Sequence, residues 1–281
     1  WLGPGFDGPV AEAQAPADDV KAGFGQAIEA SKSNMMGDPS RAYQLAADAQ
    51  AQAAARVDGA VAVVTAQWLQ GEALIRMSRP LDAAPVIDEA LAVAEIETPN
   101  AKIYGDLLSA RAAAAGMVGD YATALASLQS AHEVFLALGE SRSRAMALQN
   151  IASIYTDARD YSRALNYYEK AGEAYEGDPP IDMTRFNNIG AAYKEMGEYM
   201  KAEQGFRNAL AIADEMQSPM LESRILANIA RVQLADGRLN LADETARSGL
   251  ALSTNDGALG WEPFLRGIRG EIAFARGNLE V

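Results

Sequence analysis

The sequence offers side chains suited to binding and few suited to catalysis. It contains no cysteine, which excludes disulfides, zinc–cysteine sites and thiol chemistry. The single histidine, His132, has neither cysteine partners nor a His-Glu-x-x-His pattern, so we expect no metal site. Carboxylates such as Asp88 and Glu89 are scattered along expected solvent faces, and no glycine-rich phosphate loop is present, so we expect no cofactor. This segment is therefore predicted not to be an enzyme.

Asn150, Asn188 and Asn228 are the first candidates for binding, because each lies two residues before an alanine or glycine in a predicted helix. Asparagine is a mediocre helix former, so its recurrence at matching places calls for a reason. A carboxamide both donates and accepts hydrogen bonds, and can therefore bind the backbone of an extended peptide. The alternative is that these amides hold adjacent helical hairpins together.

Cationic side chains accompany the asparagines. Arg224 precedes Asn228 by four residues and Arg231 follows it by three, which places all three on one helix face. Lys194 lies six residues beyond Asn188, farther along its own helix. Such a strip predicts capture of a carboxylate or an acidic peptide. The alternative is that Arg224, with Glu222 nearby, is an ordinary solvated arginine.

The overall charge requires any recognition of anions to be local. The 281 residues include 24 Lys+Arg against 38 Asp+Glu, a net charge of −14, which opposes general attraction to nucleic acid or to an anionic membrane. No apolar run approaches the roughly 20 residues that cross a bilayer, so we expect no membrane insertion by this segment. The expected partner is a peptide or protein segment.

The elements that would position these residues are helices arranged in repeats. Alanine is abundant and strand-favouring runs are scarce, which predicts an all-α chain. A helix–turn–helix unit recurs every 38 to 41 residues, and small residues recur in register on its first helix. These are Ala30, Gly71, Ala112, Ala152, Gly190, Ala230 and Gly270. Small residues at a fixed period indicate stacked hairpins in close contact.

The best-defined copies, at 147–209, contain Asn-Ile-small-x-x-Tyr followed by Tyr-x-x-Ala, an aromatic residue and Ala. This pattern resembles the tetratricopeptide repeat (TPR) family, and its period is similar to that of the subclass found in kinesin light chains and bacterial sensor proteins. The resemblance implies a right-handed superhelical solenoid of antiparallel helix pairs, whose first helices line a concave peptide-binding face. The asparagines would face that groove. Trp68 would lie beside the equivalent position, as an apolar anchor or as core.

The expected organisation is a tail or linker at 1–17, then an array at 18–281 of six helix pairs and the first helix of a seventh. An unpaired helix would leave an apolar face exposed, so we expect the natural protein to continue beyond Val281. The resemblance implies the sensory or interaction module of a larger bacterial signalling protein, with an output enzyme such as a diguanylate cyclase or histidine kinase. It favours the periplasm over the cytoplasm. The alternatives are a structural scaffold and a small-metabolite sensor.

Overall fold

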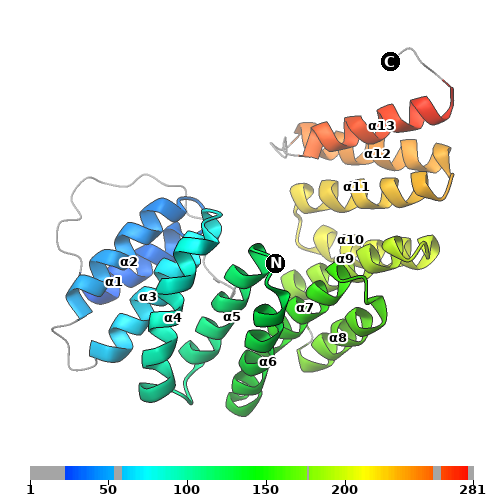
Figure 1. Ribbon diagram of the computed structural model, residues 1–281. Helices are drawn as coiled ribbons and strands as arrows, with labels where there is room; N and C mark the ends of the chain where they lie inside the picture. Colours follow the sequence, from blue (N-terminus) through cyan, green and yellow to red (C-terminus); the bar gives the residue numbers. More distant parts are fainter. Residues whose placement is uncertain (1–22, 54–58, 176, 256–260, 278–281) are drawn as a thin grey trace. The chain divides into compact units, whose positions relative to one another are not determined.

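The computed structural model describes residues 23–53, 59–175, 177–255 and 261–277. These residues form helices and no strand, which confirms the predicted all-α class (Figure 1). The helices are α1 (Phe24–Asn34), α2 (Pro39–Ala53), α3 (Gly59–Arg76), α4 (Pro80–Glu97), α5 (Lys102–Met117), α6 (Tyr121–Leu138), α7 (Ser141–Asp157), α8 (Tyr161–Ala174), α9 (Pro179–Glu195), α10 (Tyr199–Glu215), α11 (Pro219–Ala235), α12 (Leu239–Asn255) and α13 (Glu262–Ala275). The predicted tail at 1–17 lies outside the described residues.

Neighbouring helices pack as hairpins, for example α3 with α4, α9 with α10, and α11 with α12. The tight turn inside a hairpin places one residue in the left-handed region, as at Gly197 with φ 76° and Gly237 with φ 75°. Glycine adopts this conformation without steric cost. Prolines begin several helices, including α9 and α11, where their missing N–H group has no partner to lose.

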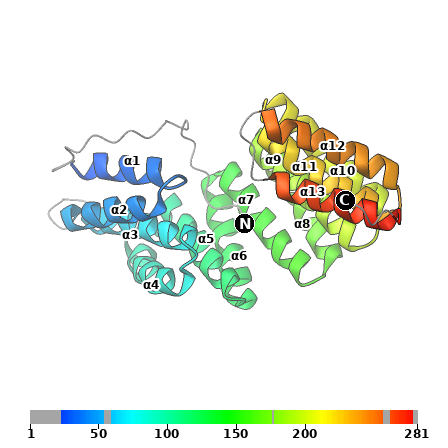
Figure 2. The same ribbon diagram turned by 90° about the horizontal axis from the view of Figure 1, so that it is seen from above.

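The helices divide into two compact units, and the boundary falls between Ile154 and Tyr155 inside α7. The first unit contains α1 to α6 and most of α7, and the second contains α8 to α13. Figure 2 turns the view by 90° and shows α11, α12 and α13 side by side within the second unit, in agreement with their packing contacts.

The small residues of the repeat allow the close approach that the sequence predicts. A Cβ atom added to Gly71 would lie 2.5 Å from Cγ1 of Ile87, and one added to Gly190 would lie 2.9 Å from Cδ1 of Phe206. Both large side chains belong to the second helix of the same hairpin and are almost fully buried. Each hairpin therefore closes by fitting one large side chain over a position without bulk.

Two apolar clusters hold the second unit together. Phe206 of α10 packs with Ile225 and Ile229 of α11 in the first cluster. Leu265 and other buried residues of α13 pack against alanines of α11 and α12 in the second. These clusters fix the faces of α9 and α11 that point inward.

Candidate functional site

The asparagines of α9 and α11 form a chain of hydrogen bonds across two helices. Asn228 Nδ2 donates to Asn187 Oδ1 at 2.9 Å, and Asn187 Nδ2 donates to Asn188 Oδ1 at 3.3 Å. All three side chains are half-buried. The structure therefore links Asn188 to Asn228 through Asn187, and the bond between α9 and α11 is a contact between neighbouring hairpins, as in the alternative that the sequence left open. Each carboxamide has four hydrogen-bonding positions, so this chain leaves donors and acceptors at both ends.

The apolar core sets this arrangement. Ile225 and Ile229 of α11 are 0% and 1% exposed, and they fix the side of the helix that faces the core. Asn228 lies between them in sequence, at the border of that buried side. On α9, Gly190 is close enough to Phe206 to draw the helix tightly onto α10. The amides consequently meet at a fixed register instead of moving freely at the surface.

Arg224 lies one turn before Asn228 and differs from the other cations of the second unit. It is half-buried, and no carboxylate among the described residues forms an ion pair with it. Its Nε atom is buried and has no hydrogen-bond partner in the described part of the chain. Burial lowers the pKa of its guanidinium, although arginine keeps its proton in folded proteins. The neighbouring Glu222 does not neutralise it.

The other two predicted cations of this strip have carboxylate neighbours. Arg231 Nη2 lies 3.9 Å from Glu271 Oε1, and both side chains are about half exposed. Lys194 Nζ lies 2.9 Å from Oε1 of the adjacent Glu195. Exposed pairs of this kind contribute little to stability and exchange readily with solvent. Arg224 is thus the cation of the strip whose charge is least compensated.

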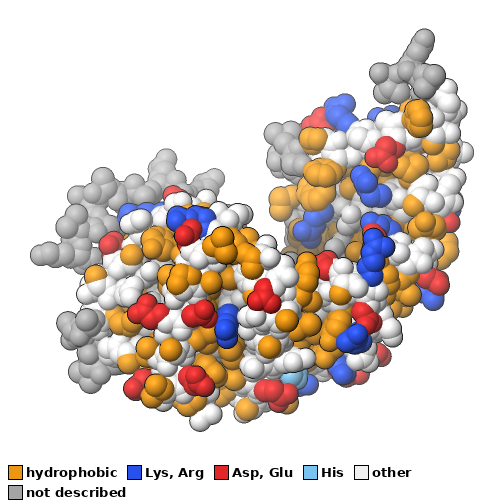
Figure 3. Space-filling view, viewed as in Figure 1, with side chains coloured by type: hydrophobic (Ala, Val, Ile, Leu, Met, Phe, Trp, Pro, Cys, Tyr) orange, Lys and Arg blue, Asp and Glu red, His pale blue; other side chains and the backbone are white. Residues whose placement is uncertain are grey.

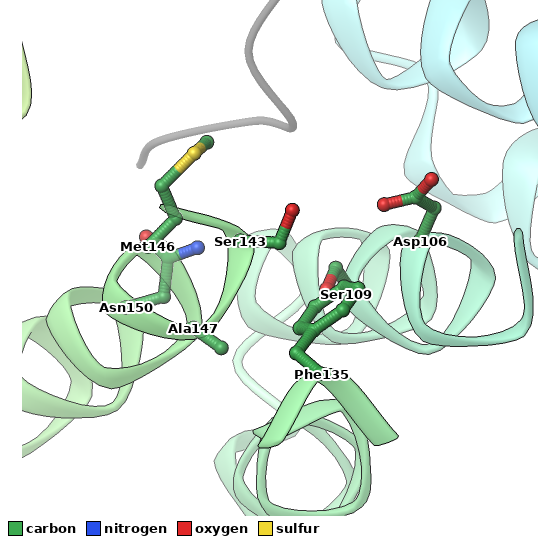
Figure 4. Close-up of a pocket in the computed structure, with 7 residues that line it drawn as sticks. All are labelled: Asp106, Ser109, Phe135, Ser143, Met146, Ala147 and Asn150. Atoms are coloured by element: carbon green, nitrogen blue, oxygen red, sulfur yellow. The ribbon is translucent and has the colours of Figure 1, made fainter. Parts of the chain in front are cut away.

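Asn150 lies in the first unit and is only 3% exposed. It lines a small cavity whose other walls come from α5, α6 and α7 (Figure 4). The lining residues are Asp106, Ser109, Phe135, Ser143, Met146, Ala147 and Asn150. The cavity has a volume of about 10 Å³, which is room for about one water molecule. In this conformation Asn150 is therefore less accessible to a peptide than Asn188 or Asn228.

Trp68 is also in the first unit, on α3, and it is 8% exposed. Residues on all sides of α3 are buried, because this helix packs against α2, α4 and α5. The indole ring consequently lies within the packed interior of the first unit. Of the two interpretations that the sequence left open, this location favours core packing over a groove anchor.

Asn187 is the member of the site that the sequence did not single out. Comparison of repeats drew attention to one column, and Asn187 lies one residue before that column. The available signal was the pair Asn187–Asn188, since two adjacent asparagines inside one helix are costly in helix propensity. A search for neighbouring polar columns would have found it.

Comparison with known proteins agrees with this architecture. Residues 103–177 match the tetratricopeptide repeat family model. This segment carries tetratricopeptide repeats. No curated protein sequence matches the chain significantly. Among solved structures, its TPR fold resembles a Signal Transduction ATPase with Numerous Domains from Pyrococcus horikoshii, described as having a tetratricopeptide repeat sensor, with TM-score 0.74 and 14% identity. That match covers 91% of this chain and 39% of the archaeal chain.

The TPR fold also resembles the apo quorum sensor NprR from B. thuringiensis, with TM-score 0.69 and 16% identity over 91% of this chain and 70% of that one. The structure of NprR in complex with its cognate peptide NprX gives TM-score 0.59 and 15% identity over 90% and 72% of the two chains. At these identities the likeness concerns the fold. Within the described part of the TPR chain, no helix is long and apolar enough to cross a membrane.

Proposed function

We propose that this TPR chain is a peptide- or protein-binding module whose recognition face in the second unit consists of Asn187, Asn188, Arg224 and Asn228. The single observation that carries the proposal is Arg224, a half-buried guanidinium that has no carboxylate partner among the described residues. An unpaired buried charge is costly, so a structure that keeps one gains from a ligand that neutralises it. The class of ligand is an extended segment with a carboxylate.

The amide chain supports this class of ligand. Asn228 and Asn188 are the two ends of the hydrogen-bonded set, and each retains unused donors or acceptors, while Arg224 lies one turn before Asn228 on α11. A peptide backbone alternates donors and acceptors, which carboxamides match in either direction. The proposal is supported by the structure of NprR in complex with its cognate peptide NprX, in which a protein of similar fold holds a peptide. By the same reasoning the module is a sensory or interaction part of a bacterial signalling protein.

The surface charge explains why a local cation matters. Figure 3 shows acidic and basic side chains interspersed among apolar ones on the face in view, without one continuous basic region. With a net charge of −14, the chain does not attract anions as a whole. Selectivity for a carboxylate must then come from one guanidinium placed beside hydrogen-bonding amides.

The amide contribution is tested by the double variant Asn188→Ala/Asn228→Ala. A library of short peptides with free carboxyl termini is screened against the unmodified chain, and the selected peptide is titrated by fluorescence polarisation. We expect a loss of affinity of about tenfold or more, because neutral hydrogen bonds contribute about 1 kcal/mol each. Asn255→Ala at the end of α12 is the control. Unchanged peptide affinity in a folded double variant would show that Asn188 and Asn228 do not bind the peptide.

The role of Arg224 is tested separately with Arg224→Ala and Arg224→Glu. The charge reversal should reduce peptide affinity more than the truncation, and binding to the unmodified chain should weaken as salt is raised from 50 to about 300 mM. Arg163→Ala removes an exposed arginine of the same unit that already pairs with Asp160, and it should leave affinity unchanged. Equal peptide affinities for the unmodified chain and the three variants would show that Arg224 does not bind a carboxylate. That result would not affect the test of the asparagines.

A further inference from the structure

A second polar site lies between α12 and α13 and plays no part in the proposal above. It is a cavity of about 450 Å³ whose walls are mainly arginine side chains. The lining residues are Asp243, Arg247, Arg266, Arg269, Gly270, Ala273 and Arg276. We call it the arginine cavity. An opening of this size, lined by planar guanidinium groups, is suited to an oxyanion.

Asp243 organises the arginines and is 7% exposed. Arg269 Nε donates to Asp243 Oδ1 at 3.0 Å, and Arg247 Nη2 donates to Asp243 Oδ2 at 2.7 Å. Arg276 Nη1 approaches Oδ2 at 3.5 Å, while its Nη2 donates to the Asn240 side chain at 2.8 Å. Burial alone would raise the pKa of Asp243, but the hydrogen bond from Arg269 and the charges of the arginines lower it. The carboxylate is therefore ionised and holds the three guanidinium groups in place.

The cluster keeps an excess of positive charge. One carboxylate faces three guanidinium groups, so two positive charges remain uncompensated by Asp243. Arg266, the fourth arginine of the lining, has its own partner, because its Nη2 lies 2.6 Å from Glu262 Oε1. The guanidinium groups are close enough to repel one another. They form a local positive cluster in a chain whose net charge is −14. A bound dianion would remove that repulsion.

Comparison with the preceding repeat shows that the arginines replace a different set of residues. Positions 266, 269 and 276 of α13 correspond to 226, 229 and 236 of α11, forty residues earlier. At these three positions α11 carries Leu226, Ile229 and Asp236. Ile229 is 1% exposed in the apolar core, whereas Arg269 at the matching place reaches Asp243. A stripe that is apolar and acidic in one repeat has become cationic in the next.

The side chain at position 273 explains why this place is open. Its counterpart in α11 is Gln233, which is fully buried and donates to Glu203 Oε1 at 3.0 Å. Glu203 corresponds to Asp243 in the repeat. In α13 the position is Ala273, so the neutral donor that fills the space in α11 is missing. Glu203 also accepts from Arg207 and pairs with Arg238, so charged donors surround the acidic residue in both repeats. The loss of the neutral donor at position 273 is the difference that opens the cavity.

The arginine cavity is separate from the α9–α11 site. Glu271 of α13 pairs with Arg231 of α11, whereas Arg269 pairs with Asp243 of α12. Residues two apart on a helix point to different sides, so these contacts lie on different flanks of α13. The cavity therefore faces α12, away from the flank that approaches the proposed peptide site.

We propose that the arginine cavity binds a dianionic phosphate group, either as the free ion or as the phosphate of a small monoester. The planar forks of Arg247, Arg269 and Arg276 match the oxygens of a phosphate. The dianion balances the two positive charges that Asp243 leaves uncompensated. The volume of about 450 Å³ exceeds that of one phosphate, so an organic group fits beside it. The inference rests on α12 and α13 alone and does not depend on the peptide site.

The first test is calorimetric titration of the 281-residue chain with inorganic phosphate and with phosphoserine, against sodium chloride at equal ionic strength. Binding should be specific for phosphate, and Arg269→Gln/Arg276→Gln should weaken it by about tenfold or more, since charge-assisted hydrogen bonds are strong. Arg163→Gln changes an exposed arginine of the same unit and should bind phosphate normally. Equal affinity for the two ligands assigns the site to the phosphate group itself, and tighter binding of phosphoserine assigns it to a monoester.

A steric variant tests the cavity without changing any charge. A Cβ atom added to Gly270 meets nothing within 4 Å, so Gly270→Leu can be accommodated and its side chain would occupy the space between the arginines. Gly267→Leu on the same helix is the matched control, because position 267 is equally open and does not line the cavity. We expect loss of phosphate binding in the first variant only. Binding no stronger than that of chloride, or equal phosphate binding by both leucine variants, would overturn the proposal.

Discussion

Glu72 is a buried carboxyl group whose ionisation opposes folding of the first unit. It lies on α3 and is 2% exposed. Burial raises its pKa to about 7, the charge of Arg76 at 4.0 Å lowers it only partly, and Asp106 raises it further. Since the pKa in the unfolded chain is near 4.5, the folded state binds the proton more tightly between about pH 4.5 and 7. Stability must therefore fall as the pH rises through this window.

The variant Glu72→Gln tests this dependence. It should remove a loss of up to about 3 kcal/mol between pH 4.5 and pH 7.5, because a shift of one pKa unit corresponds to about 1.4 kcal/mol. The measurement is the urea midpoint of unfolding across this range. Glu89→Gln removes an exposed carboxylate of the same unit and serves as the control. If the pH profile of Glu72→Gln matched that of the unmodified chain, Glu72 would not be the group responsible.

At the proposed binding site, the sequence predicted which residues share a helix face and missed how they pair. The spacing of Arg224 and Asn228 follows from the helical period alone. The hydrogen bond from Asn228 to Asn187 joins residues 41 apart, so it depends on how α10, which packs against both helices, places α11 beside α9. The missing partner of Arg224 was not predicted either, because Glu222 is nearby in sequence; two residues that are two apart on a helix do not face each other, and no ion pair joins them. The helical periodicity of side chains can be read from a sequence, whereas the pairing of a charged side chain depends on the three-dimensional structure.

At the scale of elements, close contact between α9 and α10 depends on Gly205. A Cβ atom added to Gly205 would lie 2.9 Å from both Cα and N of Gly190, which are backbone atoms and cannot rotate away. Gly205→Ala should therefore force the two helices apart. We expect a loss of about 1 to 3 kcal/mol of unfolding free energy, measured by denaturant titration.

Gly267→Ala is the matched control for this prediction. Its added Cβ atom meets nothing within 4 Å, and alanine is the better helix former, so we expect a gain of roughly 0.5 to 1 kcal/mol. A pair of variants with the same chemical change should thus shift stability in opposite directions. If Gly205→Ala were as stable as the unmodified chain, the hairpin would not depend on this approach.

The hairpins themselves were the most predictable part of the molecule. The small residues of the repeat column predicted close contact between helices, and Gly71 and Gly190 make such contacts; the pairing of these glycines with the large side chains that they meet, Ile87 and Phe206, was not predicted. The arginine cavity was not predicted, since Arg266, Arg269 and Arg276 resemble ordinary surface residues when α13 is considered alone. Two observations distinguish these arginines from ordinary surface residues. They replace Leu226, Ile229 and Asp236 of α11, and Arg269 and Arg276 contact Asp243.

At the scale of the whole molecule, a helical repeat protein is stabilised by contacts between neighbouring hairpins. α3 packs against α1, α2, α4 and α5, and α11 packs against α10, α12 and α13. The stability of such a chain is approximately a sum over repeats and their interfaces. A local defect should then weaken its own neighbourhood first, so that peptide recognition in the second unit tolerates damage in the first.

Gly71→Ala provides the test, because its Cβ atom would lie 2.5 Å from Cγ1 of Ile87 inside the first unit. Amide hydrogen exchange should become faster in α3 and α4, with little change in α9 to α12, since local opening follows the stability of contiguous elements. Binding of the selected peptide should be retained at conditions where the first unit is partly open. A uniform increase in exchange across both units would show that the chain unfolds as one cooperative body, and the binding face would then depend on every hairpin.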